Sequence, residues 1–160
     1  MKRIFLAFFA LILATLPGWA SDLNPRDGWA VHRTGKSYDA LVADVKTAVK
    51  ANGLIAVTQA GPTKAAAARG IAIPGNRVIG IFNNDFAVRV LETSTAAMIE
   101  APIRLYVTEN EDGTATLSYK LPSHVFAPYM EEGGAVLEGI AQELDKTFRV
   151  IAETAAKQSH

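Results

Sequence analysis

The C-terminal part of the chain carries a long apolar stripe that restricts the fold more than any other feature. Between residues 137 and 155, hydrophobic side chains recur at steps of three and four residues for about five turns, the spacing of one face of an α-helix. They are Leu137, Ile140, Ala141, Leu144, Phe148, Ile151, Ala152 and Ala155. A helix with such a stripe must bury it, so we expect this helix to cover a second layer of the fold.

Five segments before this helix have the composition and spacing of β-strands. They are residues 29–34, 54–57, 77–82, 103–108 and 115–119. The last two flank Asp112-Gly113, a dipeptide typical of tight turns, and are predicted to form a hairpin. Residues 77–82 are apolar on both faces, which favours the central position in the sheet.

Three shorter helices are expected between the strands. Ser37 is a suitable N-cap for a helix of about fourteen residues that ends at Asn52-Gly53. A short helix is expected to start at Gly61-Pro62 and to hold the alanine run at residues 65–68. A side chain at positions 83–85 is expected to cap a helix that continues to about residue 92. Residues 121–134 are expected to form a long loop.

This order of elements predicts one α+β domain over residues 28–157. We expect a two-layer sandwich in which a mixed or antiparallel sheet of about five strands is covered by helices, with the long helix at the C-terminus. A domain of this size can bury roughly two thirds of the surface of its unfolded chain without covalent crosslinks.

The first 20 residues have the pattern of a secretory signal peptide. Lys2-Arg3 precede an uncharged apolar run over residues 4–16, and small residues follow it. The run is too short to cross roughly 30 Å of membrane hydrocarbon easily. We therefore expect cleavage after Ala20, a periplasmic protein without a stable membrane span, and a flexible lead-in at residues 21–27.

Charge and the absence of cysteine exclude several classes of function. The full chain has 16 acidic and 16 basic residues, and removal of Lys2 and Arg3 leaves 14 basic residues and a formal charge of −2. Nucleic acid is therefore not an expected partner. Without cysteine there is no disulfide, thiolate metal site or cysteine nucleophile. The three histidines, His32, His124 and His160, form no close pair in the sequence, so we expect no metal and no cofactor.

Residues 100–107, Asp112-Gly113 and residues 118–122 resemble the family catalogued as domain of unknown function 302, a small bacterial and archaeal α+β domain. The likeness covers roughly residues 37–126 in order and spacing, and it implies that fold without an established reaction. Where the family often has Asp-His-Ala, this chain has Thr58-Gln59-Ala60. The resemblance therefore does not carry a histidine-dependent activity to this chain.

A second family motif, often Gly-Asn-Pro, is replaced here by Phe82-Asn83-Asn84. Only Asn83 carries over, and the resemblance implies a polar contact by it at the end of strand 77–82. The residues themselves suggest three further ligand-binding candidates. The complete candidate set is Asn83, Arg104, Tyr119 and His124.

Arg104 is the most informative charge because strand alternation places it on one hairpin face with Tyr106 and Thr108. A guanidinium and a phenol on one face can bind a carboxylate ligand or an acidic side chain of the same fold. A pocket would combine this polar face with the aromatic segment at residues 126–130. The alternative is that this segment packs under the C-terminal helix.

The leading functional hypothesis is a non-catalytic module that binds an unidentified small molecule or protein, because no coherent set of acid, base and nucleophile is evident. The first alternative is a metal-independent enzyme in which Arg104, Tyr119 and His124 orient a small carboxylate and transfer protons. The second is a homo-oligomerisation module, in which an exposed hairpin edge pairs across a two-fold axis to give a homodimer.

Overall fold

A computed structural model describes residues 23–157, so the expected signal peptide lies outside the described residues. Five antiparallel strands form one sheet with the order β1-β5-β4-β3-β2. Their bounds are β1 Trp29–Thr34, β2 Ile55–Ala60, β3 Asn76–Phe82, β4 Ile103–Glu109 and β5 Ala115–Lys120. The predicted α+β fold with five strands is confirmed, and the sheet is antiparallel rather than mixed.

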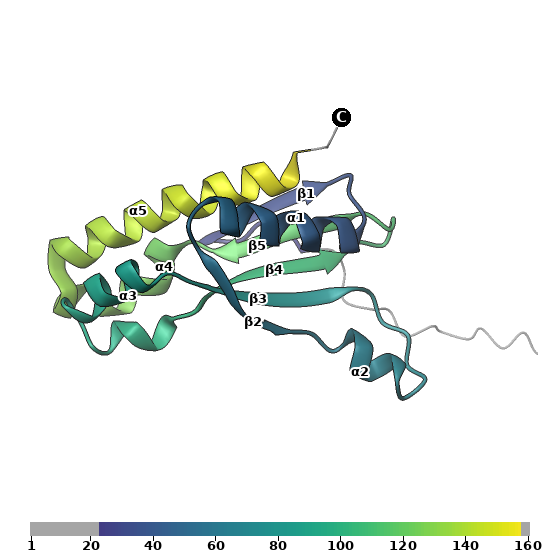
Figure 1. The fold of residues 1–160 in the computed structure, drawn as a ribbon, viewed down its shortest axis with the longest axis horizontal. Helices are drawn as coiled ribbons and strands as arrows, with labels where there is room; N and C mark the ends of the chain where they lie inside the picture. The colour runs from purple at the N-terminus through teal and green to yellow at the C-terminus, as the bar shows by residue number, and fades with distance from the viewer. Residues whose placement is uncertain (1–22, 158–160) are drawn as a thin grey trace, which may run out of the picture.

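The helices gather mainly on one face and at one end of the sheet (Figure 1). Their bounds are α1 Tyr38–Ala51, α2 Thr63–Ala67, α3 Asn84–Leu91, η1 Ala97–Glu100, α4 Pro122–Phe126, η2 Ala127–Tyr129 and α5 Met130–Ala156. Helices α1 and α5 pack against each other over the sheet (Figure 1). No helix within residues 23–157 is long and apolar enough to cross a membrane.

The predicted stripe of α5 is buried along its whole length against α1 and the sheet. The strands contribute Leu105 and Val107 from β4 and Leu117 from β5, and each of these side chains is fully buried. Because Leu105 pairs with Tyr119 and Val107 with Leu117, these residues share the sheet face that the helices cover. One hydrophobic core therefore lies between the sheet and the α1–α5 layer.

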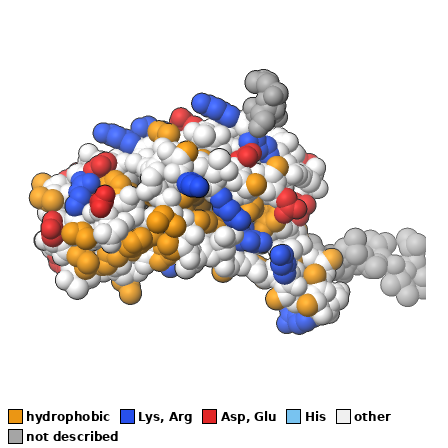
Figure 2. Space-filling view, in the orientation of Figure 1, with side chains coloured by type: hydrophobic (Ala, Val, Ile, Leu, Met, Phe, Trp, Pro, Cys, Tyr) orange, Lys and Arg blue, Asp and Glu red, His pale blue; other side chains and the backbone are white. Residues whose placement is uncertain are grey.

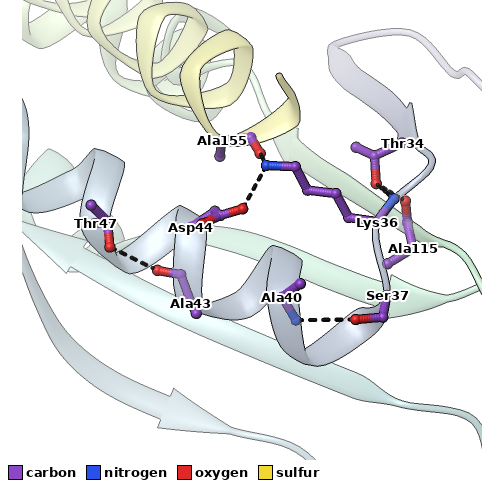
Figure 3. Close-up of polar contacts among 9 residues, drawn as sticks. All are labelled: Thr34, Lys36, Ser37, Ala40, Ala43, Asp44, Thr47, Ala115 and Ala155. Carbon is purple, nitrogen blue, oxygen red and sulfur yellow. Dashed lines mark hydrogen bonds and ion pairs between the residues drawn. The ribbon is translucent and has the colours of Figure 1, made fainter. Parts of the chain in front are cut away.

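Polar contacts hold the start of α1 against the end of α5 (Figure 3). The Ser37 Oγ caps α1 by accepting a hydrogen bond from Ala40 N at 3.4 Å. The neighbouring Lys36 side chain is only 10% exposed, and its Nζ donates to Asp44 Oδ2 at 2.5 Å and to the Ala155 carbonyl at 2.8 Å. Lys36 thereby links β1, α1 and α5.

Three expectations about the arrangement are wrong. β4, not β3, is the middle strand, because β2 pairs on the outer side of β3. Both hairpin strands are internal, since β4 also pairs with β3 and β5 with β1, so no free hairpin edge is available for a two-fold partner. The segment expected to be a long loop contains α4 and η2, and Pro122 starts α4 because a proline at the first helical position loses no helical hydrogen bond.

Candidate functional site

Within the described residues, no helix lies across the second face of the sheet, and strand pairing arranges its side chains in rows (Figure 1). In the first row Trp29 of β1 is paired with Lys120 of β5. The register that pairs Leu105 with Tyr119 places the next residues along these strands, Arg104 and Lys120, side by side. Two cationic side chains therefore stand next to each other, with an indole beside them.

The second row of side chains on this face is more apolar than the first. Val31 is paired with Ser118, Ser118 with Tyr106, and Tyr106 with Val78. The Tyr106 hydroxyl accepts a hydrogen bond from Asn76 Nδ2, which fixes the phenol over β3. The predicted sharing of one face by Arg104 and Tyr106 is therefore confirmed.

A cavity of about 520 Å³ lies on this face, bounded by four strands and by the η1 and α4–η2 segments. Its apolar walls include Val78, Val125 and Pro128, and its polar groups include the Arg104, Lys120 and His124 side chains. The volume falls in the range of about 300–1,000 Å³ that is typical of small-molecule sites. Apolar walls with a few polar groups are the usual composition of such sites.

The His124 imidazole borders this cavity and lies close to the Gly28 backbone before β1. A Cβ atom placed on Gly28 would lie 2.3 Å from the His124 Nδ1, so the imidazole occupies the space that a side chain there would need. Leu121 N donates to the Gly28 carbonyl at 2.9 Å, and Ser123 N donates to Asp145 Oδ1 at 2.9 Å. These contacts fix the start of α4 between β1 and α5.

Tyr119 also borders the cavity, but its ring lies on the opposite, helix-covered side of the sheet. It stacks on His32 with ring centroids 6.1 Å apart and packs against Phe148 at 5.4 Å. Burial raises the pKa of the Tyr119 hydroxyl to about 12, so the group stays protonated at neutral pH. Tyr119 is therefore not placed to act as a base on a ligand bound beside Arg104.

Asn83 lies away from the other three candidates. Its Oδ1 accepts a hydrogen bond from Phe86 N at 3.1 Å and caps α3, while its Nδ2 donates to the Gly53 carbonyl at 2.9 Å. It borders a separate apolar cavity of about 40 Å³ between α3, η1 and α5. Exposed apolar side chains gather toward this end of the molecule (Figure 2). The polar atoms of Asn83 are occupied by the fold.

Trp29, Lys120 and Glu100 border the main cavity and were not among the sequence candidates. Lys120 Nζ lies 6.0 Å from the centre of the Trp29 ring, within cation–π range, and both residues border the cavity. Glu100 stands on the η1 side, where its Oε1 accepts a hydrogen bond from the Tyr129 hydroxyl at 2.8 Å. Strand alternation in the sequence could have predicted that Lys120 lies on the same sheet face as Ser118. Its proximity to Trp29 could not be predicted in this way, because it depends on the pairing of β1 with β5.

The expected aromatic segment contributes to the cavity through different residues. Phe126 is buried in the core, and Tyr129 is engaged with Glu100, whereas Val125 and Pro128 form the cavity wall. Each helical turn directs only part of its side chains toward the sheet, so the cavity is bordered by Val125 and Pro128 and not by Phe126, Tyr129 or Met130.

The charged groups of the cavity favour binding of an anion. Arg104 is exposed and makes no hydrogen bond or ion pair with any residue between 23 and 157. Lys120 adds a second positive charge, and the acidic group of the cavity, Glu100, is bound to Tyr129. In the described part of the chain, no three histidine, aspartate or glutamate side chains are grouped as metal ligands. The cavity thus offers cationic donors beside apolar walls.

Comparisons with known proteins agree with this fold. The crystal structure of an uncharacterized conserved protein DUF302 from Bacillus stearothermophilus is similar to it, with a TM-score of 0.71 and 16% sequence identity. The match covers 82% of this chain and 100% of that chain. No curated protein matches this chain. The sequence model of the family described as "Domain of unknown function DUF302" matches residues 30–155, and the chain therefore belongs to the DUF302 family.

Proposed function

We propose that this domain is a non-catalytic module that binds a small molecule in the cavity on the uncovered face of the sheet. The observation that carries the proposal is the unpaired Arg104 guanidinium in a cavity of about 520 Å³ with apolar walls. Arg104 is exposed and borders the cavity beside a second exposed cation, Lys120, so both positive charges are available to a ligand there.

The arrangement of the candidate residues supports binding over catalysis. Arg104 and the His124 imidazole share the cavity, whereas the Tyr119 hydroxyl lies on the other side of the sheet. The three groups of the enzyme hypothesis thus do not face one substrate, and proton transfer requires hydrogen-bond reach. A guanidinium and an ammonium can instead hold an anionic group without any chemical step.

A thermal-shift screen of small carboxylates, phosphates and neutral compounds tests the proposal. A ligand at 100 times its dissociation constant stabilises the protein by about 2.7 kcal/mol. For a domain of this size, this corresponds to a rise in Tm of roughly 8–10 °C. The absence of a shift with every compound would contradict the proposed function.

A matched pair of variants locates the binding. Val78→Trp places a large ring on the cavity wall and should abolish the shift, because Val78 faces the cavity. Val57→Trp makes the same change on the exposed edge strand β2, where Val57 is 48% exposed, and should leave the shift intact. A ligand that stabilises Val78→Trp as strongly as the unmodified protein binds elsewhere.

We also propose that the domain functions outside the cytoplasm. The basic, apolar and small-residue order of residues 1–20 supports this proposal. Mass spectrometry of the protein from a periplasmic fraction should give a mature chain that begins at Ser21. A cytoplasmic protein that retains Met1 would contradict it.

A further inference from the structure

The geometry points to an amphipathic monoacid as the ligand: one carboxylate or phosphate head bound by Arg104 and Lys120, with an apolar body along the cavity walls. This inference rests on the proposed function and specifies its ligand class. It depends on the position of the two cations, on the acid at the opposite wall and on the surface between them.

Two like charges lie unfavourably close together in the cavity. Arg104 and Lys120 stand side by side on adjacent strands, an arrangement that destabilises a sheet unless another charge compensates it. No acidic side chain within residues 23–157 forms an ion pair with either of them. An anionic group bound between them would supply that compensation. The planar guanidinium can bind a carboxylate or a phosphate through two parallel hydrogen bonds.

The surroundings of the two cations favour one position for the head group of the ligand. Lys120 Nζ lies 6.0 Å from the Trp29 ring centre, which favours the ammonium at that side of the cavity. The Glu100 carboxylate lies on the η1 side and would repel a second acidic group there. The charge pattern therefore favours one anionic head at the β4–β5 side over a diacid that spans the cavity.

The cavity also offers apolar surface to the rest of the ligand. Val78, Val125 and Pro128 come from three different elements and border the same cavity. Contact with them removes apolar ligand surface from water, which favours binding. A small polar anion such as acetate would leave these walls unused, so we expect affinity to increase with the length of an apolar body.

Tryptophan fluorescence can measure this specificity at the site itself. The chain contains two tryptophans, and Trp19 lies in the expected signal peptide, so in the mature chain from Ser21 onward Trp29, which borders the cavity, is the single reporter. The probes are two matched pairs, phenylacetate with phenylacetamide and octanoate with octanamide, together with phenyl phosphate. We expect each acid to bind at least tenfold more tightly than its amide. The affinities of phenyl phosphate and phenylacetate then show whether the site prefers a phosphate or a carboxylate head group.

Variants connect the discrimination to the named cations. In Arg104→Gln or Lys120→Gln, the preference for acid over amide should fall below about threefold, while amide binding changes little. Arg104→Lys, which retains the charge but not the two-pronged geometry, should give an intermediate preference. Arg69→Gln, a change of an exposed arginine that does not border the cavity, is the control and should leave the preference intact.

The outcomes separate this inference from the proposed function. Equal affinity for acids and amides would overturn the inference, and the proposed function would stand on binding of a neutral ligand. Failure of both acids to bind would also overturn the inference, while the thermal screen decides independently whether the domain binds small molecules. If the preference for acid over amide persists in both Arg104→Gln and Lys120→Gln, with unchanged circular dichroism, the anionic group binds to other residues and the inference is overturned.

Discussion

Gly28 supports the cavity wall because its missing side chain leaves room for the His124 imidazole. We predict that Gly28→Ala destabilises the domain by about 2–3 kcal/mol and displaces the imidazole. Gly28 has a φ of 72°, in the left-handed region, where a non-glycine residue costs about 1–2 kcal/mol. The added methyl would also lie 2.3 Å from His124 Nδ1 and 2.4 Å from its Cγ. His124 is exposed and can rotate away, so this contact adds about 1 kcal/mol.

A double-mutant cycle with His124→Ala separates the two contributions. In the His124→Ala background the clash is absent, so Gly28→Ala should cost only the backbone strain of about 1–2 kcal/mol. Urea denaturation monitored by circular dichroism gives each free energy of unfolding, with equal m-values as the check on two-state behaviour. An equal cost of Gly28→Ala in both backgrounds would refute the proposed contact between the Gly28 backbone and His124.

Three further predictions concern stability. Lys36→Met should cost about 1–3 kcal/mol in urea denaturation, because it leaves the Ala155 carbonyl and a carboxylate without their donor; a cost below about 0.5 kcal/mol would show that this link is not stabilising. Burial holds the pKa of His32 below its usual 6.5, so the unfolded chain takes up the proton more readily. Stability should therefore fall as the pH drops below 6.5, and less so in His32→Gln; identical pH profiles would contradict this. Arg104→Gln should leave Tm unchanged or slightly higher, since it removes a repulsion, and a clear fall in Tm would reveal a partner within the fold.

The features that could be predicted from the sequence are those set by neighbours in the chain. Ser37 and Asn83 act as helix caps because their side-chain oxygens reach backbone amides three residues ahead. The Asp112-Gly113 turn closes with Gly113 at a φ of 78°. Alternation along a single strand placed Arg104 beside Tyr106, and both line the cavity. Each of these predictions needed only a local period or a local hydrogen bond.

The features that were missed depend on contacts between distant segments. The pairing of Trp29 with Lys120 joins the first and last strands, and no local pattern specifies the order of strands in a sheet. Helix α4 is too short to show an amphipathic stripe, and tertiary contacts fix it, through the Gly28 carbonyl and the Asp145 carboxylate. The cavity wall formed by Val125 and Pro128 therefore could not be assigned before the fold was known.

Amide chemical-shift mapping tests the central claim, that ligands bind on the uncovered face of the sheet, most directly. Titration of the ¹⁵N-labelled protein with octanoate should shift the amide signals around Arg104, Lys120 and His124. The amides of the opposite layer, in the middle of α1 and α5, should change little. Shifts confined to the α1–α5 layer or to the apolar surface at α3 would contradict the account.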